Sequence, residues 1–184
     1  MKLFVSPHND DAPLWGSFTL QCERPLVLTV FDSHIQPARG HTRCDAETRR
    51  QEDREAMTFL GCAIEFSGVP DNEPDASIQH RVRAALSGWN PSEVWLPAVE
   101  TGGHDQHNLV GAVGLEIFSG TRIHRYLTYT RTGGKSTNGR EIKPTGAMVL
   151  KKLQALTCYR TQLEIDALGC WPHFIRDQNE YAVD

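Results

Sequence analysis

The sequence predicts an α/β fold, namely a three-layer sandwich with a mostly parallel, Rossmann-like sheet, in a single domain spanning residues 1–184. Strand-like and helix-like segments alternate at least four times, which is typical of a parallel sheet with helices on both faces. A length of 184 residues suits one domain, and 39% hydrophobic residues can supply its core. No run of 18 apolar residues occurs, so no transmembrane helix is expected.

Short apolar runs mark the predicted strands. The run PLVLTVF at Pro25–Phe31 is the clearest, because continuous apolar and β-branched residues are typical of a strand buried on both faces. Shorter runs predict strands at Lys2–Ser6, 62–66, 93–96 and 123–130.

Apolar residues at helical spacing predict the helices. Residues 45–60 show this pattern, and Gly61 stands where the helix would end. Residues 75–87 and 105–118 have similar one-sided apolar patterns. Pro144 is expected to open a further helix that runs to about Tyr159, because proline is favoured in a first turn. Loops are predicted at 67–74 and 131–143, and the last 25 residues give no clear pattern.

Charge and cysteine content exclude several classes of protein. The net charge is −4 and the basic residues are scattered, whereas a nucleic-acid binder usually carries a basic face. Five cysteines, an odd number without a C-x-x-C pair, argue against a disulfide framework or a cysteine-based zinc site. Reduced thiols in a cytoplasmic protein are the simplest interpretation.

Polar residues follow the first and fourth predicted strands. His8, Asp10 and Asp11 come after the first strand, and His104 and His107 come after the fourth. Ligand sites in such folds lie beyond the carboxyl ends of the strands. Adjacent buried carboxylates repel each other unless a cation is present, and histidines three apart face the same side of a helical turn. The sequence therefore predicts a metal site where these two segments meet.

Two histidines and a carboxylate with an open fourth position make up the ligand count of a catalytic zinc site, and Fe²⁺ accepts the same donors. His8, Asp11 and His107 are the candidate ligands, with Asp10 as general base and His104 as acid or oxyanion donor. Two other interpretations stay open. The aspartate pair is also typical of a helix N-cap, and the histidine pair of a polar surface.

Four motifs, in this order, resemble those of the PIG-L/LmbE-like family of zinc-dependent de-N-acetylases. The resemblance extends from residue 3 to about residue 162. The segment His8-Asn9-Asp10-Asp11-Ala12 is similar to the family's His-Pro-Asp-Asp-Glu, and His104-Asp105-Gln106-His107 to its His-Pro-Asp-His. The other two matches are the helix motif Arg49, Glu52, Ala56, Leu60 and Gly61, and the segment Tyr159-Arg160-Thr161-Gln162.

The resemblance implies a role for each site residue. Asp10 would activate the zinc-bound water, and His104 would stabilise the oxyanion or protonate the leaving amine. Arg49 would contact the substrate, the alternative being a surface or capping ion pair with Glu52. The implied zinc ligands are His8, Asp11 and His107.

The resemblance further implies hydrolysis of an N-acetyl bond in a small-molecule substrate, an N-acetylated amino sugar or small sugar conjugate. From the charge distribution and the lack of a long apolar run, no nucleic-acid or membrane partner is expected. Three motif positions differ: Asn9 replaces Pro, Ala12 replaces Glu and Gln106 replaces Asp. Because the chain is also short for the family, the alternative is a non-catalytic member that keeps the metal or another ligand in a reduced pocket.

Overall fold

Strand β1 (Lys2–His8) lies near the middle of a sheet whose strand order is β3-β2-β1-β4-β5-β7-β6. The computed structural model describes residues 1–32, 45–71, 76–130, 137, 139–165 and 179–183. Within these residues seven strands form one sheet, and neighbours from β3 to β5 all pair in parallel. The predicted α/β fold with a mostly parallel sheet is thereby confirmed.

The other parallel strands are β2 (Leu26–Phe31), β3 (Ile64–Val69), β4 (Glu93–Pro97) and β5 (Arg122–Tyr126). All five predicted strands are present, with shifted ends. β3 begins two residues later than predicted and takes in 67–69 of the predicted loop. β5 ends at Tyr126 instead of residue 130.

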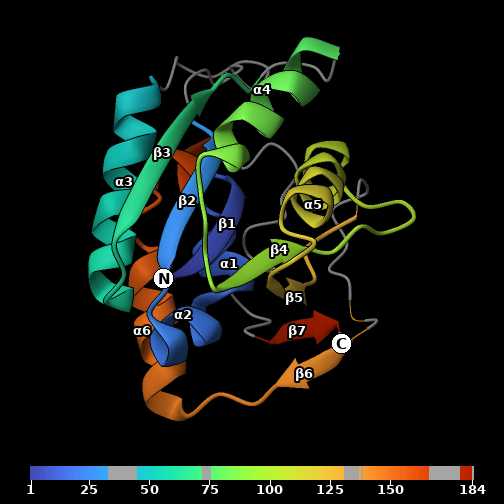
Figure 1. Ribbon diagram of the computed structural model, residues 1–184. Coiled ribbons are helices and arrows are strands. Elements are labelled where there is room, and N and C mark those ends of the chain that lie inside the picture. The colour runs from blue at the N-terminus through green and yellow to red at the C-terminus, as the bar shows by residue number, and fades with distance from the viewer. Residues whose placement is uncertain (33–44, 72–75, 131–136, 138, 166–178, 184) are drawn as a thin grey trace.

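Helices cover both faces of the sheet, and the sheet lies between two hydrophobic cores (Figure 1). On one side lie α3 (Ala46–Leu60) and α6 (Gly146–Leu156), and on the other α4 (Ala76–Ser87) and α5 (Asp105–Ile117). Side chains of β1 alternate between the cores, since Phe4 packs in the first and Leu3 and Val5 in the second. The protein therefore has three layers, with the sheet between two layers of helices.

Capping residues fix the helix ends. Asp45 accepts a hydrogen bond from the Thr48 backbone N–H at 2.7 Å at the start of α3, and Gly61 ends this helix at a φ of 75°. The prediction that Pro144 opens α6 is wrong. Thr145 is the N-cap and the helix begins at Gly146, because a threonine side chain can accept the Met148 N–H whereas proline offers no such acceptor.

The structure adds elements that the sequence did not predict. Two short helices, α1 (Asp11–Trp15) and α2 (Ser17–Glu23), lie between β1 and β2, and α7 (Arg160–Ile165) follows α6. Strands β6 (Arg140–Ile142) and β7 (Glu180–Val183) pair antiparallel at one edge. Residues 140–142 were predicted as loop, and a three-residue strand is too short for an alternating pattern to show. The remainder of the predicted 131–143 loop lies largely outside the described residues.

Buried charges tie the last strand to the rest of the molecule. Lys152 Nζ lies 2.8 Å from Glu180 Oε1 and donates to the Leu14 carbonyl at 2.8 Å. The other Glu180 oxygen accepts from the Phe18 backbone N–H. The antiparallel edge is therefore joined to α1, α2 and α6. None of the helices in the described residues is long and apolar enough to cross a membrane.

Candidate active site

The carboxyl ends of β1 and β4 bring the two polar segments together. β1 pairs with β4, with Phe4 opposite Trp95. His8 is the last residue of β1 and Asp11 the first of α1, while His104 is the N-cap of α5 and His107 lies in its first turn. Residues almost a hundred positions apart thus meet between β1 and β4, at the point where the strand order of the sheet reverses.

Three side-chain atoms form a nearly equilateral triangle. His8 Nδ1 lies 3.0 Å from Asp11 Oδ2 and 3.1 Å from His107 Nε2, and the last two atoms are 3.1 Å apart. Asp11 and His107 are each only 1% exposed. Metal bonds of about 2.0–2.1 Å in a tetrahedral site separate the ligand atoms by roughly 3.3 Å. The triangle therefore fits a zinc-sized divalent cation.

His104 lies beside this triangle. It offers a nitrogen that, with those of His8 and His107, completes a group within 4.8 Å. Its Nδ1 is buried and has no hydrogen-bond partner among the residues that the structure describes. Burial, followed by the nearby His8 and His107, lowers the pKa of His104 to about 4. The neutral ring can serve as a further ligand or as a hydrogen-bonding group for a bound molecule.

Neighbouring residues orient the triangle, and the sequence did not single them out for this role. The Trp15 indole N–H donates to Asp11 Oδ1 at 3.0 Å, and the His8 backbone N–H donates to Asp11 Oδ2 at 2.8 Å. His107 Nδ1 lies 2.9 Å from the Thr128 hydroxyl. The spacing of four between Asp11 and Trp15 is the signal that points to the first contact, whereas nothing in the sequence links Thr128 to His107.

Asp10 stands next to the triangle in an unusual backbone conformation. Its φ is 156° with a ψ of −18°, a region that non-glycine residues seldom adopt and that is typical of functional sites. Burial raises the pKa of Asp10 to about 7, although the Arg49 guanidinium opposes this effect. Arg49 Nη2 lies 3.5 Å from Asp10 Oδ2.

Arg49 is buried, with 4% of its surface exposed, and the contacts described for it are with protein groups. Its Nη1 donates to Glu52 Oε2 and to the Thr161 hydroxyl, both at 3.1 Å, and its Nη2 reaches the Asn9 carbonyl at 3.5 Å. The ion pair with Glu52 that the sequence left as the alternative is thus present, but buried. The same guanidinium also approaches Asp10.

Comparisons with known proteins identify the family. The model of the family described as PIG-L, GlcNAc-PI de-N-acetylase, matches residues 3–118. The chain belongs to the PIG-L family. A search of curated protein sequences found no match to this chain.

Solved structures share the PIG-L fold of this chain. A deacetylase triple mutant of the teicoplanin biosynthetic pathway, Orf2*T, has a TM-score of 0.72 and 19% identity over 95% of this chain and 87% of its own. The N,N'-diacetylchitobiose deacetylase from Pyrococcus horikoshii has a TM-score of 0.70 and 20% identity over 95% of this chain and 75% of its own. GalB, the 4-carboxy-2-hydroxymuconate hydratase of Pseudomonas putida KT2440, has a TM-score of 0.66 and 16% identity over 96% and 84%. Since one of these enzymes is a hydratase, the shared fold does not by itself select the reaction.

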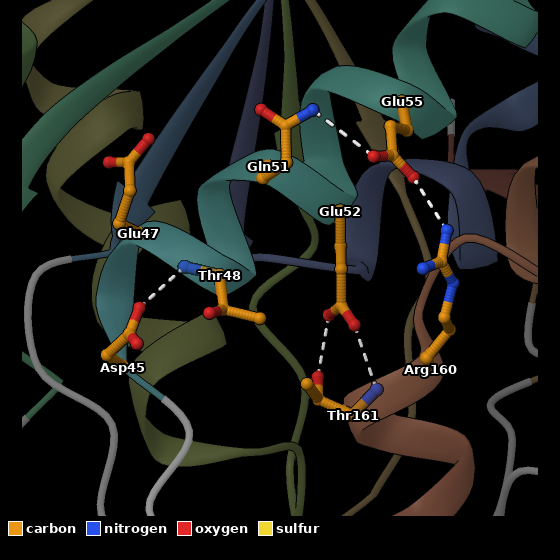
Figure 2. Close-up of a pocket in the computed structure, with 8 residues that line it drawn as sticks. All are labelled: Asp45, Glu47, Thr48, Gln51, Glu52, Glu55, Arg160 and Thr161. Atoms are coloured by element: carbon orange, nitrogen blue, oxygen red, sulfur yellow. Dashed lines mark hydrogen bonds and ion pairs between the residues drawn. The ribbon is translucent and has the colours of Figure 1, made fainter.

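A cavity of about 500 Å³ opens beside the Arg49 side of this PIG-L site, between α3 and the start of α7 (Figure 2). Figure 2 shows Glu52 reaching Thr161 and Arg160 reaching Glu55 across it. Glu52 lines this cavity and also accepts a hydrogen bond from Arg49. Because Arg49 in turn lies beside Asp10, the Arg49 side chain connects the wall of the cavity to Asp10. Its lining residues are Asp45, Glu47, Thr48, Gln51, Glu52, Glu55, Arg160 and Thr161.

Proposed function

We propose that this chain is a metal-dependent hydrolase that removes an acetyl group from the nitrogen of an amino sugar or small sugar conjugate. The observation that carries the proposal is the triangle of His8, Asp11 and His107 atoms at mutual distances of 3.0–3.1 Å in a chain of the PIG-L family. Zinc is the proposed metal, and Fe²⁺ is the alternative because imidazole and carboxylate donors suit both.

The donor set fits such a metal. Asp11 is buried between two imidazoles, and its second oxygen accepts the Trp15 N–H, which fixes the carboxylate orientation. Bound there, a divalent cation polarises the amide carbonyl and lowers the pKa of a coordinated water to about 7. Three protein ligands leave a position open for substrate or water, as catalytic zinc sites require. Support from a similar fold comes from the zinc-inhibited form of the teicoplanin deacetylase Orf2.

Asp10 and His104 supply the proton transfers in this proposal. Asp10, adjacent to the ligand Asp11 and held near Arg49, accepts a proton from the attacking water. The water oxygen then bonds to the amide carbon, the C–N bond breaks, and acetate and the free amine leave. Neutral His104, whose Nδ1 has no partner among the described residues, can donate a hydrogen bond to the developing oxyanion. The proton on Asp10 passes to the leaving amine, either directly or through His104, which then gives its own N–H proton to the amine and takes the one from Asp10.

Amino sugars are the proposed substrate class. The matching family is described as GlcNAc-PI de-N-acetylase, and one enzyme of the same fold is an N,N'-diacetylchitobiose deacetylase. The cavity of Figure 2 offers carboxylate, amide and hydroxyl groups that can hydrogen-bond to sugar hydroxyls. Contact of Arg49 with the substrate stays a prediction. We place the activity in the cytoplasm because Cys22, Cys62 and Cys158 are free thiols.

Turnover of N-acetylglucosamine and N,N'-diacetylchitobiose, followed by release of primary amine, tests the proposal. Asp10→Asn should keep its zinc and lose about 10²–10⁴-fold in kcat/KM, as expected for loss of a general base. Asp105→Asn makes the same chemical change at an exposed position of the first turn of α5 and should remain active. Full activity of Asp10→Asn would remove this residue from the mechanism.

The zinc content of the purified protein tests whether His8, Asp11 and His107 form the proposed metal site. His107→Ala should retain far less zinc than the wild type after equal exposure and desalting. Equal, low zinc in both would show that His8, Asp11 and His107 do not form the site. About one zinc per wild-type chain with no turnover of any N-acetyl sugar would instead support the non-catalytic alternative.

A further inference from the structure

Gln106 lies between a proposed metal ligand and an acidic residue from another part of the chain. It belongs to the first turn of α5 and is 7% exposed. Its Oε1 lies 2.7 Å from His8 Nε2, and its Nε2 donates to Asp71 Oδ1 at 2.7 Å. His8 ends β1 and Asp71 follows β3, so three segments meet in one row of hydrogen bonds.

The acidic end of this row fixes the direction of every bond in it. An ionised carboxylate only accepts, so the amide group of Gln106 must turn its NH₂ toward Asp71. Its carbonyl oxygen then faces His8, and because that oxygen also only accepts, His8 Nε2 must carry the hydrogen. The other ring nitrogen, Nδ1, is then the one left for a metal ion, which would replace any proton that the neighbouring Asp11 carboxylate stabilises there. Nδ1 is the atom 3.0 Å from Asp11 and 3.1 Å from His107.

We propose that Gln106 is a positioning residue that relays the Asp71 carboxylate to His8. The relay keeps a hydrogen on His8 Nε2 and leaves Nδ1 as the nitrogen that would bind the metal. The inference rests on the proposed function only through the metal site. The family motif has an acid where this chain has Gln106, and the structure provides a carboxylate one hydrogen bond further out, from a residue outside that motif.

The second proposed histidine ligand shows why the relay matters. His107 Nδ1 faces the Thr128 hydroxyl, which can either donate or accept. Thr128 therefore does not select a tautomer by itself, whereas the Gln106–Asp71 row does. Partners of this kind orient a ligating imidazole, and their loss typically weakens metal binding by about 10–100-fold.

Zinc affinity of the full chain, measured by competition with a chromophoric chelator, tests the relay. Gln106→Leu should raise the zinc Kd by about 10–100-fold, while Gln154→Leu, the same substitution at an exposed position of α6, should leave it unchanged. Asp71→Leu should also raise the Kd, because the amide loses the partner that orients it. Asp71→Glu should keep more of the affinity than Asp71→Leu, because its carboxylate still only accepts.

Retained affinity in Asp71→Glu separates positioning from a merely structural role. Long-range ¹⁵N–¹H spectra of the metal-free, histidine-labelled chain add a second readout. The wild type should show a hydrogen held on His8 Nε2, and Asp71→Leu should weaken or lose that signal.

A Gln106→Leu variant that binds zinc as tightly as the wild type would overturn the relay. So would an Asp71→Glu variant as weak as Asp71→Leu, or a wild-type His8 without a hydrogen on Nε2. The spectra need no metal. A wild type that binds no zinc but shows the expected hydrogen on Nε2 would overturn the proposed function and leave the relay standing.

Discussion

The buried pair Lys152–Glu180 offers a quantitative test of how the fold is held together. Both side chains are at most 1% exposed, and Nζ and Oε1 lie 2.8 Å apart. Lys152→Met would leave the Glu180 carboxylate in the core without its cation, with the Phe18 N–H still donating to it. Breaking a buried pair in this way costs about 3–5 kcal/mol. That is a large part of the roughly 5–15 kcal/mol by which a domain is stable.

The expected loss is easily measured. At about 2–4 °C per kcal/mol for a domain of this length, the Tm of Lys152→Met should fall by roughly 6–20 °C. Urea unfolding of the chelator-treated chain, followed by circular dichroism, gives the free energy directly. Lys151→Met, at an exposed position next to it in α6, is the matched control and should remain close to the wild type.

A double variant shows whether the unpaired charge is the cause. Lys152→Met combined with Glu180→Gln removes both charges, and the glutamine oxygen can still accept the Phe18 N–H. The remaining cost is that of the Leu14 carbonyl, which loses the lysine donor, at about 1–3 kcal/mol. The double variant should therefore be more stable than Lys152→Met alone. A loss below about 1 kcal/mol in the single variant, or a double variant no more stable than it, would refute this reasoning.

Three further predictions concern α5, a buried acid and the arginine beside Asp10. Gly111→Ala would place a Cβ 2.4 Å from the Pro97 carbonyl oxygen and should lower the unfolding free energy by about 1–3 kcal/mol; Gly120→Ala, with nothing within 4 Å, should have no such effect in the same urea titration. Burial raises the pKa of Asp53 from 3.8 to about 6 in the folded chain. The folded state thus holds a proton that the unfolded state has already released, so wild-type stability relative to Asp53→Asn should fall as the pH rises through this window and level off above it; a pH-independent difference would contradict this. Arg49→Lys should lower kcat by about 10–100-fold at unchanged zinc content, because a displaced Asp10 loses its alignment; unchanged kcat would exclude this positioning role.

Much of the fold could be predicted from local pattern. The run at Pro25–Phe31 is buried as β2, and Asp45 and Gly61 bound α3 as their capping chemistry requires. A buried strand and a helix end depend on residues close together in the chain, so both can be recognised from the sequence. The start of α6 was misplaced because two residues in a row, Pro144 and Thr145, carry start signals and only the threonine supplies an acceptor.

The site was predictable in its residues but not in its geometry. The spacing of the aspartates after β1 and of the histidines before and within α5 indicated a metal centre, and their family motifs gave them roles. Arg49 was assigned to the substrate from its motif alone. Only the structure shows that its guanidinium is buried against Glu52 and Asp10.

The sequence by itself determined the alternation of strands and helices, the end of α3 at Gly61 and the identity of the polar groups at the strand ends. Tertiary structure decided which strands are neighbours, and hence that His8 and His107 meet. It also decided the short edge strands β6 and β7, whose stability comes from pairing and from the buried Lys152–Glu180 contact. The partners Trp15, Thr128 and Asp71 were likewise fixed only by folding. A hydrogen bond depends on distances between atoms of segments far apart in the chain, and no local pattern encodes those distances.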